Sequence, residues 1–245
     1  MISRNFTKFL MLILTILALL NFNLELFIVA LILGWFMGGI VVSVLLHRKI
    51  SHRLFEFKNN FAKWSCYTLL LMSGHSSPIG WGGVHRLHHS KTDTMDDPQS
   101  PHSVGKLKTF FSIYWLKNPN PKQMIDMLKD KELVFIHKYY NHIFALYAAL
   151  LFVIDPLYCF YLAGVAPVVC LLFPGFINTF AHDDYTCDNN TMAKNFSGIF
   201  FLLLFWGENL HKDHHIDPTK VRYHKYDLGY FFIKLLGRTH DSQTK

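Results

Sequence analysis

An uncharged apolar run from Leu26 to Leu46 most constrains how this chain can fold. The run holds 21 residues, and one serine is its only clearly polar side chain. A helix rises about 1.5 Å per residue, so the run is long enough to cross the roughly 30 Å hydrocarbon core of a bilayer. Charged residues make up only 17% of the chain, against about 25% in soluble domains. We therefore expect an all-α integral membrane protein, not a disordered chain, a coiled coil or a disulfide scaffold.

Three further apolar segments extend this prediction to four transmembrane helices, at about residues 6–22, 26–46, 138–154 and 157–181. Asp155 and Pro156 separate the last two, because proline breaks a helix. The polar stretch from Asn21 to Glu25 joins the first two as a helical hairpin. Residues 1–24 could instead be a signal peptide, but no small-residue cleavage site follows them. The run from Phe196 to Trp206 is too short to span and is interpreted as a buried or interfacial helix.

The basic residues predict which side of the membrane each loop occupies. With four spans, both termini and the loop 47–141 lie on one side, and all 24 lysines and arginines fall there. Lysine and arginine favour the cytosolic side, so we expect one domain over residues 1–245 with a cytosolic cap at 47–137 and 182–245. The net charge of +7 suits a membrane surface, and we expect no nucleic-acid partner. The four cysteines form no C-x-x-C pair and are expected to be reduced and buried.

The 15 histidines include three ordered clusters that predict a metal centre. The first is an H-x4-H pair, and the other two are H-x2-H-H boxes. Residues three and four apart share one face of a helix, so each H-x2-H-H box directs three imidazoles into one small volume. Two such helices face to face could surround a pair of metal ions, and neutral imidazole suits iron, zinc, copper and nickel. The clusters are His47 and His52; His85, His88 and His89; and His211, His214 and His215.

Two more candidate ligands lie at the end of the fourth predicted span. His182 falls on the cytosolic side like the three clusters, and Asn178 precedes it by one helical turn. The candidate ligand set is thus nine histidines plus this amide, which could bind a metal directly or through a water. His75, near the second box, is left open. The other histidines are interpreted as ordinary core or surface residues: His102, His137, His142, His224 and His240.

Metal-ligating histidines usually donate their second ring N–H to a carboxylate or carbonyl. Glu208 is the preferred candidate, because it precedes His211 by three residues and would share its helix face. The other carboxylates near the boxes are either such acceptors or surface acids: Asp93, Asp96, Asp97, Asp183, Asp184 and Asp213.

The order of the three boxes resembles that of the membrane-bound fatty acyl desaturase family. The first box resembles H-R-x-x-S-H-R, and the second resembles H-R-x-H-H followed by D and D-P. Trp81, Asn178-x3-His182 and Gly207-Glu208-x-x-His211 resemble the Δ9-type, stearoyl-CoA desaturase-like branch. The resemblance covers about residues 35–236.

The resemblance implies four transmembrane helices under a cytosolic cap that holds two iron ions, with an acyl chain in a tunnel passing them. It implies that the nine histidines and Asn178 hold the irons, and that O₂ is a co-substrate in forming a cis, Δ9 double bond. Gly83 stands where relatives acting on acyl-CoA often carry arginine, so acyl-CoA, acyl-carrier and acyl-lipid substrates all stay open. An anionic head group could meet Arg48, Arg53, Arg86 or Lys91 unless these are solvated surface residues.

The expected electron donor is a separate cytochrome b5 or ferredoxin, since no fused cytochrome b5 motif is present. The expected membrane is the endoplasmic reticulum in a eukaryote or the inner membrane in a bacterium. An acyl hydroxylase or acetylenase on the same scaffold is the alternative activity. A histidine-rich metal transporter is disfavoured, because it would place ligating residues inside the spans.

Overall fold

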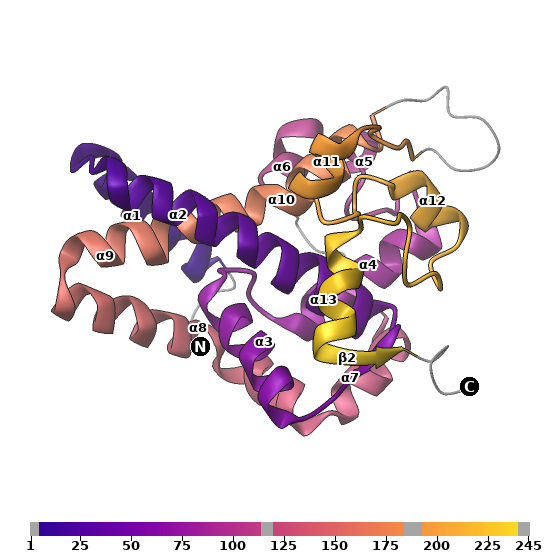
Figure 1. Cartoon of the computed structure of the whole chain (residues 1–245), viewed down its shortest axis with the longest axis horizontal. Coiled ribbons are helices and arrows are strands. Elements are labelled where there is room, and N and C mark those ends of the chain that lie inside the picture. Colours follow the sequence, from indigo (N-terminus) through magenta and orange to yellow (C-terminus); the bar gives the residue numbers. More distant parts are fainter. Residues whose placement is uncertain (1–4, 114–119, 184–192, 240–245) are drawn as a thin grey trace.

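The computed structural model describes residues 5–113, 120–183 and 193–239 (Figure 1). These residues form helices apart from one short antiparallel ribbon, in which β1 (Phe55–Phe57) pairs with β2 (Gly237–Thr239). The predicted all-α class is therefore correct with that small exception. Cys187, Asp184 and His240 lie outside the described residues.

Two long apolar helices form the frame of the molecule. In the first, α2 (Leu24–Met37) continues into the π-helix η1 (Gly38–Ser51). In the second, α9 (Pro156–Phe160), the π-helix η3 (Tyr161–Val165) and α10 (Ala166–Phe180) follow one another. The side chain of Asp155 caps this second helix, and Pro156 occupies its first turn, where its missing N–H costs nothing. Both helices are long and apolar enough to cross a membrane.

The other two predicted spans are also helices, but length and composition do not qualify them as membrane-crossing. Helix α1 (Phe6–Leu20) has only 15 residues. Helix α8 (Lys131–Ile154) has 24 residues, starts seven residues before the prediction, and carries charges in its first half. Its second half is apolar.

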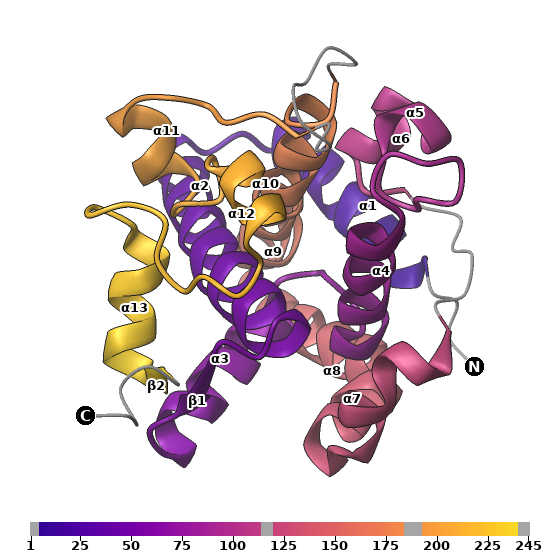
Figure 2. The ribbon, with the colours of Figure 1, turned by 90° about the vertical axis from the view of Figure 1, so that its right-hand side faces the viewer.

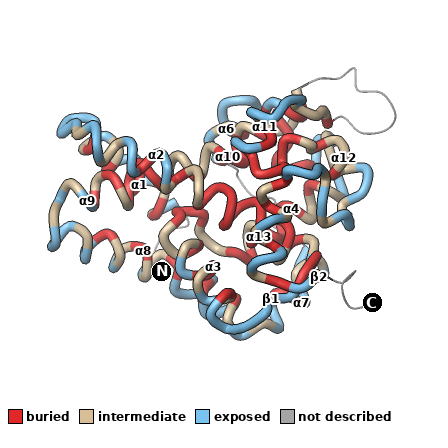
Figure 3. Tube along the Cα trace, in the orientation of Figure 1, coloured by how far each residue is buried: buried red, intermediate tan, exposed pale blue. Residues whose placement is uncertain are grey.

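Many of the exposed apolar side chains lie on α1, α2, α8 and α9, which reach one end of the long axis (Figure 1). Val153 and Ile154 at the end of α8 are 84% and 71% exposed, and Leu20 of α1 is 75% exposed. Figure 3 shows that the buried residues concentrate toward the opposite end instead. Soluble monomers rarely expose apolar patches of this extent, and such patches mark contact with a membrane or a partner.

The opposite end holds the two histidine-bearing helices, α4 (Pro78–Lys91) and α12 (His211–Ile216), which face the viewer in Figure 2. Ser77 caps α4 through the N–H of Gly80. The run predicted as a helix over 196–206 is shorter, α11 (Ile199–Leu204), and exposes Ile199 and Phe200. The remaining elements are α3 (Asn60–Met72), α5 (Pro101–Val104), α6 (Lys106–Phe110), η2 (Pro121–Met124), α7 (Ile125–Lys129) and α13 (Leu228–Leu236).

Candidate metal centre

Five histidines from three parts of the chain form a first group, which we call site A. One ring nitrogen from each lies within 4.8 Å of those of the others. Its members come from η1 and the residue after it, from α4 and from α12. They are His47, His52, His85, His89 and His214.

The π-helical geometry of η1 brings His47 and His52 together. In an α-helix, residues five apart are rotated by about 140°, so the two rings would diverge. A π-helix bonds residue i to residue i+5, and the His52 N–H donates to the His47 carbonyl at 3.1 Å. The two rings consequently lie with their centroids 4.9 Å apart. The H-x4-H spacing thus fits a π-turn.

Four further histidines form a second group, which we call site B: His88, His182, His211 and His215. Their ring nitrogens also lie within 4.8 Å of one another. Adjacent residues of a helix project about 100° apart. The sequence neighbours His88 and His89 of α4 therefore belong to different sites. All nine predicted histidines are thus brought into two adjoining groups. Among the described residues, no other histidine belongs to either one.

Hydrogen-bond partners assign the proton to Nδ1 in three of these rings. Nδ1 of His88 lies 2.8 Å from Asp97, and Nδ1 of His182 lies 2.8 Å from Asp93. An ionised carboxylate only accepts, so each ring donates from Nδ1. Tyr223 donates its hydroxyl to the Asp217 carbonyl and thereby accepts from Nδ1 of His214 at 2.9 Å. The Nε2 atoms of these three rings are left with lone pairs.

These lone pairs face the Nε2 atoms of other imidazole rings. Neighbouring Nε2 atoms in the two sites lie 2.9–3.2 Å apart. Two ligands at right angles on a metal with bonds of about 2.1 Å would be about 3.0 Å apart. Burial lowers the pKa of five of the nine rings well below the usual histidine value, which keeps them neutral as ligation requires: His85, His89, His211, His214 and His215. The residues therefore fit a pair of metal ions.

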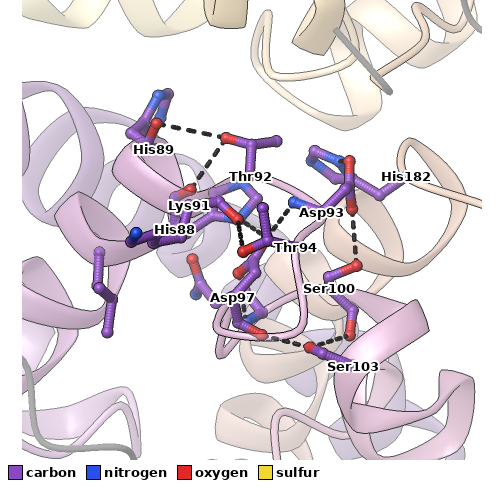
Figure 4. Close-up of polar contacts among 12 residues, drawn as sticks. His88, His89, Lys91, Thr92, Asp93, Thr94, Asp97, Ser100, Ser103 and His182 are labelled. Carbon is purple, nitrogen blue, oxygen red and sulfur yellow. Dashed lines mark hydrogen bonds and ion pairs between the residues drawn. The ribbon is translucent and has the colours of Figure 1, made fainter.

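Two carboxylates support site B from the loop after α4 (Figure 4). Asp93 takes a left-handed conformation with φ of 57°, which aspartate tolerates better than most residues. Its side chain accepts from His182 and from Ser100 Oγ at 2.7 Å. Burial opposes ionisation of Asp93, but the hydrogen bonds from His182 and Ser100, together with the electrostatic effect of His182 and His88, outweigh it and lower the pKa of this carboxyl. Both predicted candidates, Asp93 and Asp97, thus contact a histidine of site B.

Glu208 contacts a histidine other than the expected one. We expected it one helical turn before His211, but α12 begins only at His211, and Trp206 and Gly207 have positive φ angles that form a turn. Glu208 Oε2 instead lies 2.7 Å from Nδ1 of His47, in site A.

The other candidate carboxylates have different partners. Asp183 pairs with Lys106 at 2.5 Å, and Asp213 accepts from Asn195 at 2.9 Å. Asp96 is exposed, and Asp184 lies outside the described residues.

Two of the arginines considered for an anionic head group are paired with carboxylates of this chain. Arg48 is 1% exposed and pairs with Glu208 and Asp227. Arg86 makes two hydrogen bonds to Asp126 and also donates to the carbonyls of Ile50 and Ser51. Arg86 therefore fastens α4 to the end of η1. Arg53 and Lys91 remain exposed.

A small cavity touches both sites. It has a volume of about 20 Å³, which is room for about one water molecule. Asn178 lines it together with His47, His85 and His211, so the predicted amide ligand lies beside the two groups. Trp81 lines it too and stacks on His85 with ring centroids 5.1 Å apart. An acyl chain is far larger, so the cavity is not the open tunnel that the resemblance implied.

Sequence reasoning missed three residues that contact the histidines or their partners. Tyr223 binds His214, Asp227 binds Arg48, and His102 donates to the His182 carbonyl at 2.7 Å. Tyr223 and Asp227 lie in no motif, so nothing local in the sequence marks them. His102 was interpreted as an ordinary residue, and it lies outside both sites.

The chain is similar to known desaturases and to one acetylenase. The chain is 27% identical to an sn-1 stearoyl-lipid 9-desaturase of Anabaena variabilis, over 88% of this chain and 82% of the relative. It is 28% identical to acyl-CoA desaturase 1 of Saccharomyces cerevisiae, over 83% of this chain but 43% of the relative. It is 25% identical to a hex-5-enoyl-[acyl-carrier protein] acetylenase of Moorena producens, over 84% of this chain and 72% of the relative.

The fatty acid desaturase family model matches residues 23–230, which include both histidine sites and the two long apolar helices. Histidine groups suited to metal ions agree with the two irons that this family uses. The chain therefore belongs to the fatty acid desaturase family, a family of membrane-bound oxidoreductases.

Proposed function

We propose that the chain is an O₂-dependent acyl desaturase that introduces a cis double bond at Δ9 of a saturated fatty acyl chain. The observation that carries the proposal is the pair of buried groups holding nine imidazoles whose nitrogens face one another. Three of the relatives that support Δ9 are the desaturases of Anabaena variabilis, Nostoc and Caenorhabditis elegans, each 26–28% identical.

The proposed cofactor is a pair of iron ions, one in each site. His47, His52, His85, His89 and His214 would hold one ion, and His88, His182, His211 and His215 the other, with Asn178 binding directly or through a water. Zinc would fit the nitrogens but has no redox chemistry. Bound iron would supply the O₂ activation that removes two hydrogens from an unactivated C–C pair. The balance is two hydrogens from the substrate, two electrons from a donor and two protons from solvent, which together reduce O₂ to two waters.

The residues around the small cavity would position the reacting carbons and exclude water. Its lining combines the site histidines with the apolar side chains of Phe173 and Ile177. An acyl chain needs more room than about 20 Å³, so binding requires lining side chains to move apart. An apolar lining that excludes water from the metal site limits side reactions with water.

We propose that residues 1–245 form one domain and that α1, α2–η1, α8 and α9–α10 all cross the membrane, with the cap on the cytosolic side. The apolar exposed end of the molecule supports this arrangement, as does the position of most lysines and arginines in the predicted cytosolic segments. The membrane would be the inner membrane of a bacterium or the endoplasmic reticulum of a eukaryote.

The substrate is proposed to be an acyl-lipid, an acyl-CoA or an acyl-carrier species, and the donor a separate cytochrome b5 or ferredoxin. The relatives include acyl-lipid and acyl-CoA desaturases and one enzyme that acts on an acyl-carrier substrate. Arg48 and Arg86 are engaged with carboxylates, so fewer basic groups are left for the phosphates of coenzyme A than the sequence suggested.

An acetylenase or hydroxylase is the second candidate, and the similarity to the Moorena producens acetylenase favours it. The two activities need the same metal site and differ in how the substrate lies against it.

The test is gas chromatography–mass spectrometry of total fatty acids from a desaturase-null host that expresses the chain or its His88→Ala variant. We expect a new monoene with its double bond at C9, absent from the variant. A triple-bonded or hydroxylated product would move the function to the second candidate. Failure of the purified chain to bind iron, together with no new product, would overturn the proposal.

A further inference from the structure

A buried arginine lies behind site A and connects it to the C-terminal segment. Arg48 follows His47 directly, and its guanidinium makes a two-pronged pair with Asp227, with both N–O distances 3.2 Å. Its Nε lies 3.3 Å from Glu208 Oε1, and Nη2 donates to the Trp206 carbonyl at 3.3 Å. Arg48, Asp227 and Glu208 are 1%, 3% and 8% exposed. Two-pronged pairs of this kind fix both position and orientation.

Arg48, Asp227 and Glu208 form a buried network. It reaches two histidines of site A, one through Glu208 and the other through Tyr223. Glu208 lies against Nδ1 of His47 at 2.7 Å, and Ser43 donates to its other oxygen at 2.5 Å. On the other side, the Tyr223 main-chain N–H donates to Asp227 at 3.3 Å, and the Arg48 guanidinium lies 5.6 Å from the Tyr223 ring. The Tyr223 hydroxyl accepts from His214.

Two glycines lie so close to Arg48 and Asp227 that a side chain at either position would collide with the pair. A Cβ at Gly229 would lie 2.7 Å from Arg48 Nη1, and a Cβ at Gly207 would lie 2.6 Å from the Asp227 carboxyl. Both distances are shorter than van der Waals contact, so a larger residue at either position would displace the pair. Gly207 also has φ of +90°, a conformation that suits glycine.

The charges of the network match a cation at site A. Glu208 and Asp227 carry two negative charges and Arg48 carries one positive charge, so the buried trio holds one net negative charge. A buried charge is costly unless it is paired. Glu208 contacts Nδ1 of His47, so a metal cation bound to Nε2 of the same ring would lie on the opposite side of the ring. Its positive charge would balance the remaining negative charge.

Site B has separate support. Asp93 and Asp97 both come from the loop after α4 and contact His182 and His88. Among the interactions of the described residues, none joins either carboxylate to Arg48, Asp227 or Tyr223. The two sites are thus fixed by different parts of the chain.

We propose that Arg48 and Asp227 are positioning residues for site A, holding Glu208 against His47 and Tyr223 against His214. The inference rests on the proposed two-metal function. Metal retention at site A then depends on the segment 223–229, whereas retention at site B does not. Supporting residues of this kind typically change metal affinity about 10–100-fold.

The test measures zinc retention by the full-length chain in detergent, using Zn²⁺ as a probe without redox chemistry. Metal-stripped protein is loaded with Zn²⁺ and dialysed against rising chelator concentrations, and zinc per chain is measured by mass spectrometry. The variant is Asp227→Asn, because asparagine still caps α13 through the Tyr230 N–H but loses the charge that pairs with Arg48. We expect one zinc to be lost at about 10–100-fold lower chelator concentration, with the second zinc unmoved.

Two further variants assign the lost ion. Adding His47→Ala to Asp227→Asn should cost less retention than His47→Ala costs alone, whereas adding His211→Ala should remove the unmoved zinc as well. Arg48→Lys, which keeps the charge without the two-pronged geometry, should behave like Asp227→Asn and serves in its place if that variant does not accumulate. Glu56→Gln breaks the neighbouring exposed pair with Lys49 and should change nothing.

The outcomes separate this inference from the proposed function. If the wild type binds no zinc or only one, the two-metal function itself fails. If the wild type binds two and Asp227→Asn behaves identically, the positioning role is refuted. Loss of both ions together in the variant would also overturn it, since that marks a general loss of structure.

Discussion

Replacing Asp97 by asparagine tests the carboxylate support of site B. The Asp97 side chain is fully buried and accepts three N–H groups, each at 2.8 Å, from His88 Nδ1, the Asp93 main chain and the Gln99 main chain. Asparagine offers one accepting oxygen and an amide that only donates. At least one of the three donors must then face an NH₂ group, whichever way the amide is turned.

The cost has two parts. An unsatisfied buried donor costs about 1–3 kcal/mol of folding stability. Loss of the charge behind His88 weakens this ligand, and such changes reduce metal affinity about 10–100-fold, which is about 1.4–2.7 kcal/mol. Because Asp97 contacts only site B among the nine histidines, one ion of the two should be affected.

The assay is chelator competition on the full-length chain, with metal content per chain at each chelator concentration and thermal unfolding of the metal-free form. Asp97→Asn should release one ion at about 10–100-fold lower chelator concentration and lower the melting temperature. Asp213→Asn is the matched control, because Asp213 adjoins His214 in sequence but its carboxylate bonds to Asn195. If Asp97→Asn retains both ions as the wild type does, while His88→Ala loses one, the reasoning is refuted.

Three other outcomes are expected. Without metal, the free energy of unfolding should fall as pH drops below about 6.5, the ordinary histidine pKa. Burial lowers the pKa of His52 to about 2, so in this pH range the unfolded chain binds a proton that the folded chain does not. Each such residue lowers the free energy of unfolding by about 1.4 kcal/mol per pH unit. A melting temperature that does not change between pH 7 and 5 would contradict this. Tyr223→Phe removes the acceptor for His214 and should lower the free energy of unfolding by about 0.5–1.5 kcal/mol. It should also weaken zinc retention at site A, but less than Asp227→Asn does in the same dialysis experiment. Arg86→Lys loses the two-pronged bond to Asp126 and should lower the free energy of unfolding in denaturant by about 1.5–3 kcal/mol. An unchanged denaturation midpoint would contradict this.

The sequence predicted the long helices and the candidate ligands because both depend on local pattern. The apolar run from Leu26 predicted the start of α2 within two residues, and the Asp155–Pro156 break predicted the end of α8 and the start of α9 within one residue. The start of α8 and the end of η1, where the chain is more polar, were predicted seven and five residues away. The i, i+3, i+4 spacing correctly predicted that each H-x2-H-H box would lie on a helix.

The parts that failed depend on contacts between distant segments. How nine histidines divide into five and four follows from how α4 and α12 meet, which no spacing reveals. Glu208 was expected beside His211, but a turn with positive φ at Trp206 and Gly207 directs it to His47. Arg48 was considered for an anionic head group, yet its partner Asp227 lies 179 positions further along the chain.

The wide sequence separation of the ligands determines when metal can enter during synthesis of the protein. Site A needs residues from His47 to His214, and its supporting contacts reach Asp227. A ribosome adds about 5–20 residues per second, so the early boxes wait many seconds, with their helices already made, for the last one. We therefore expect each site to bind metal only after the last box has been made, and a chain cut short between residues 182 and 211 would carry six of the nine candidate histidines without a complete set for either site.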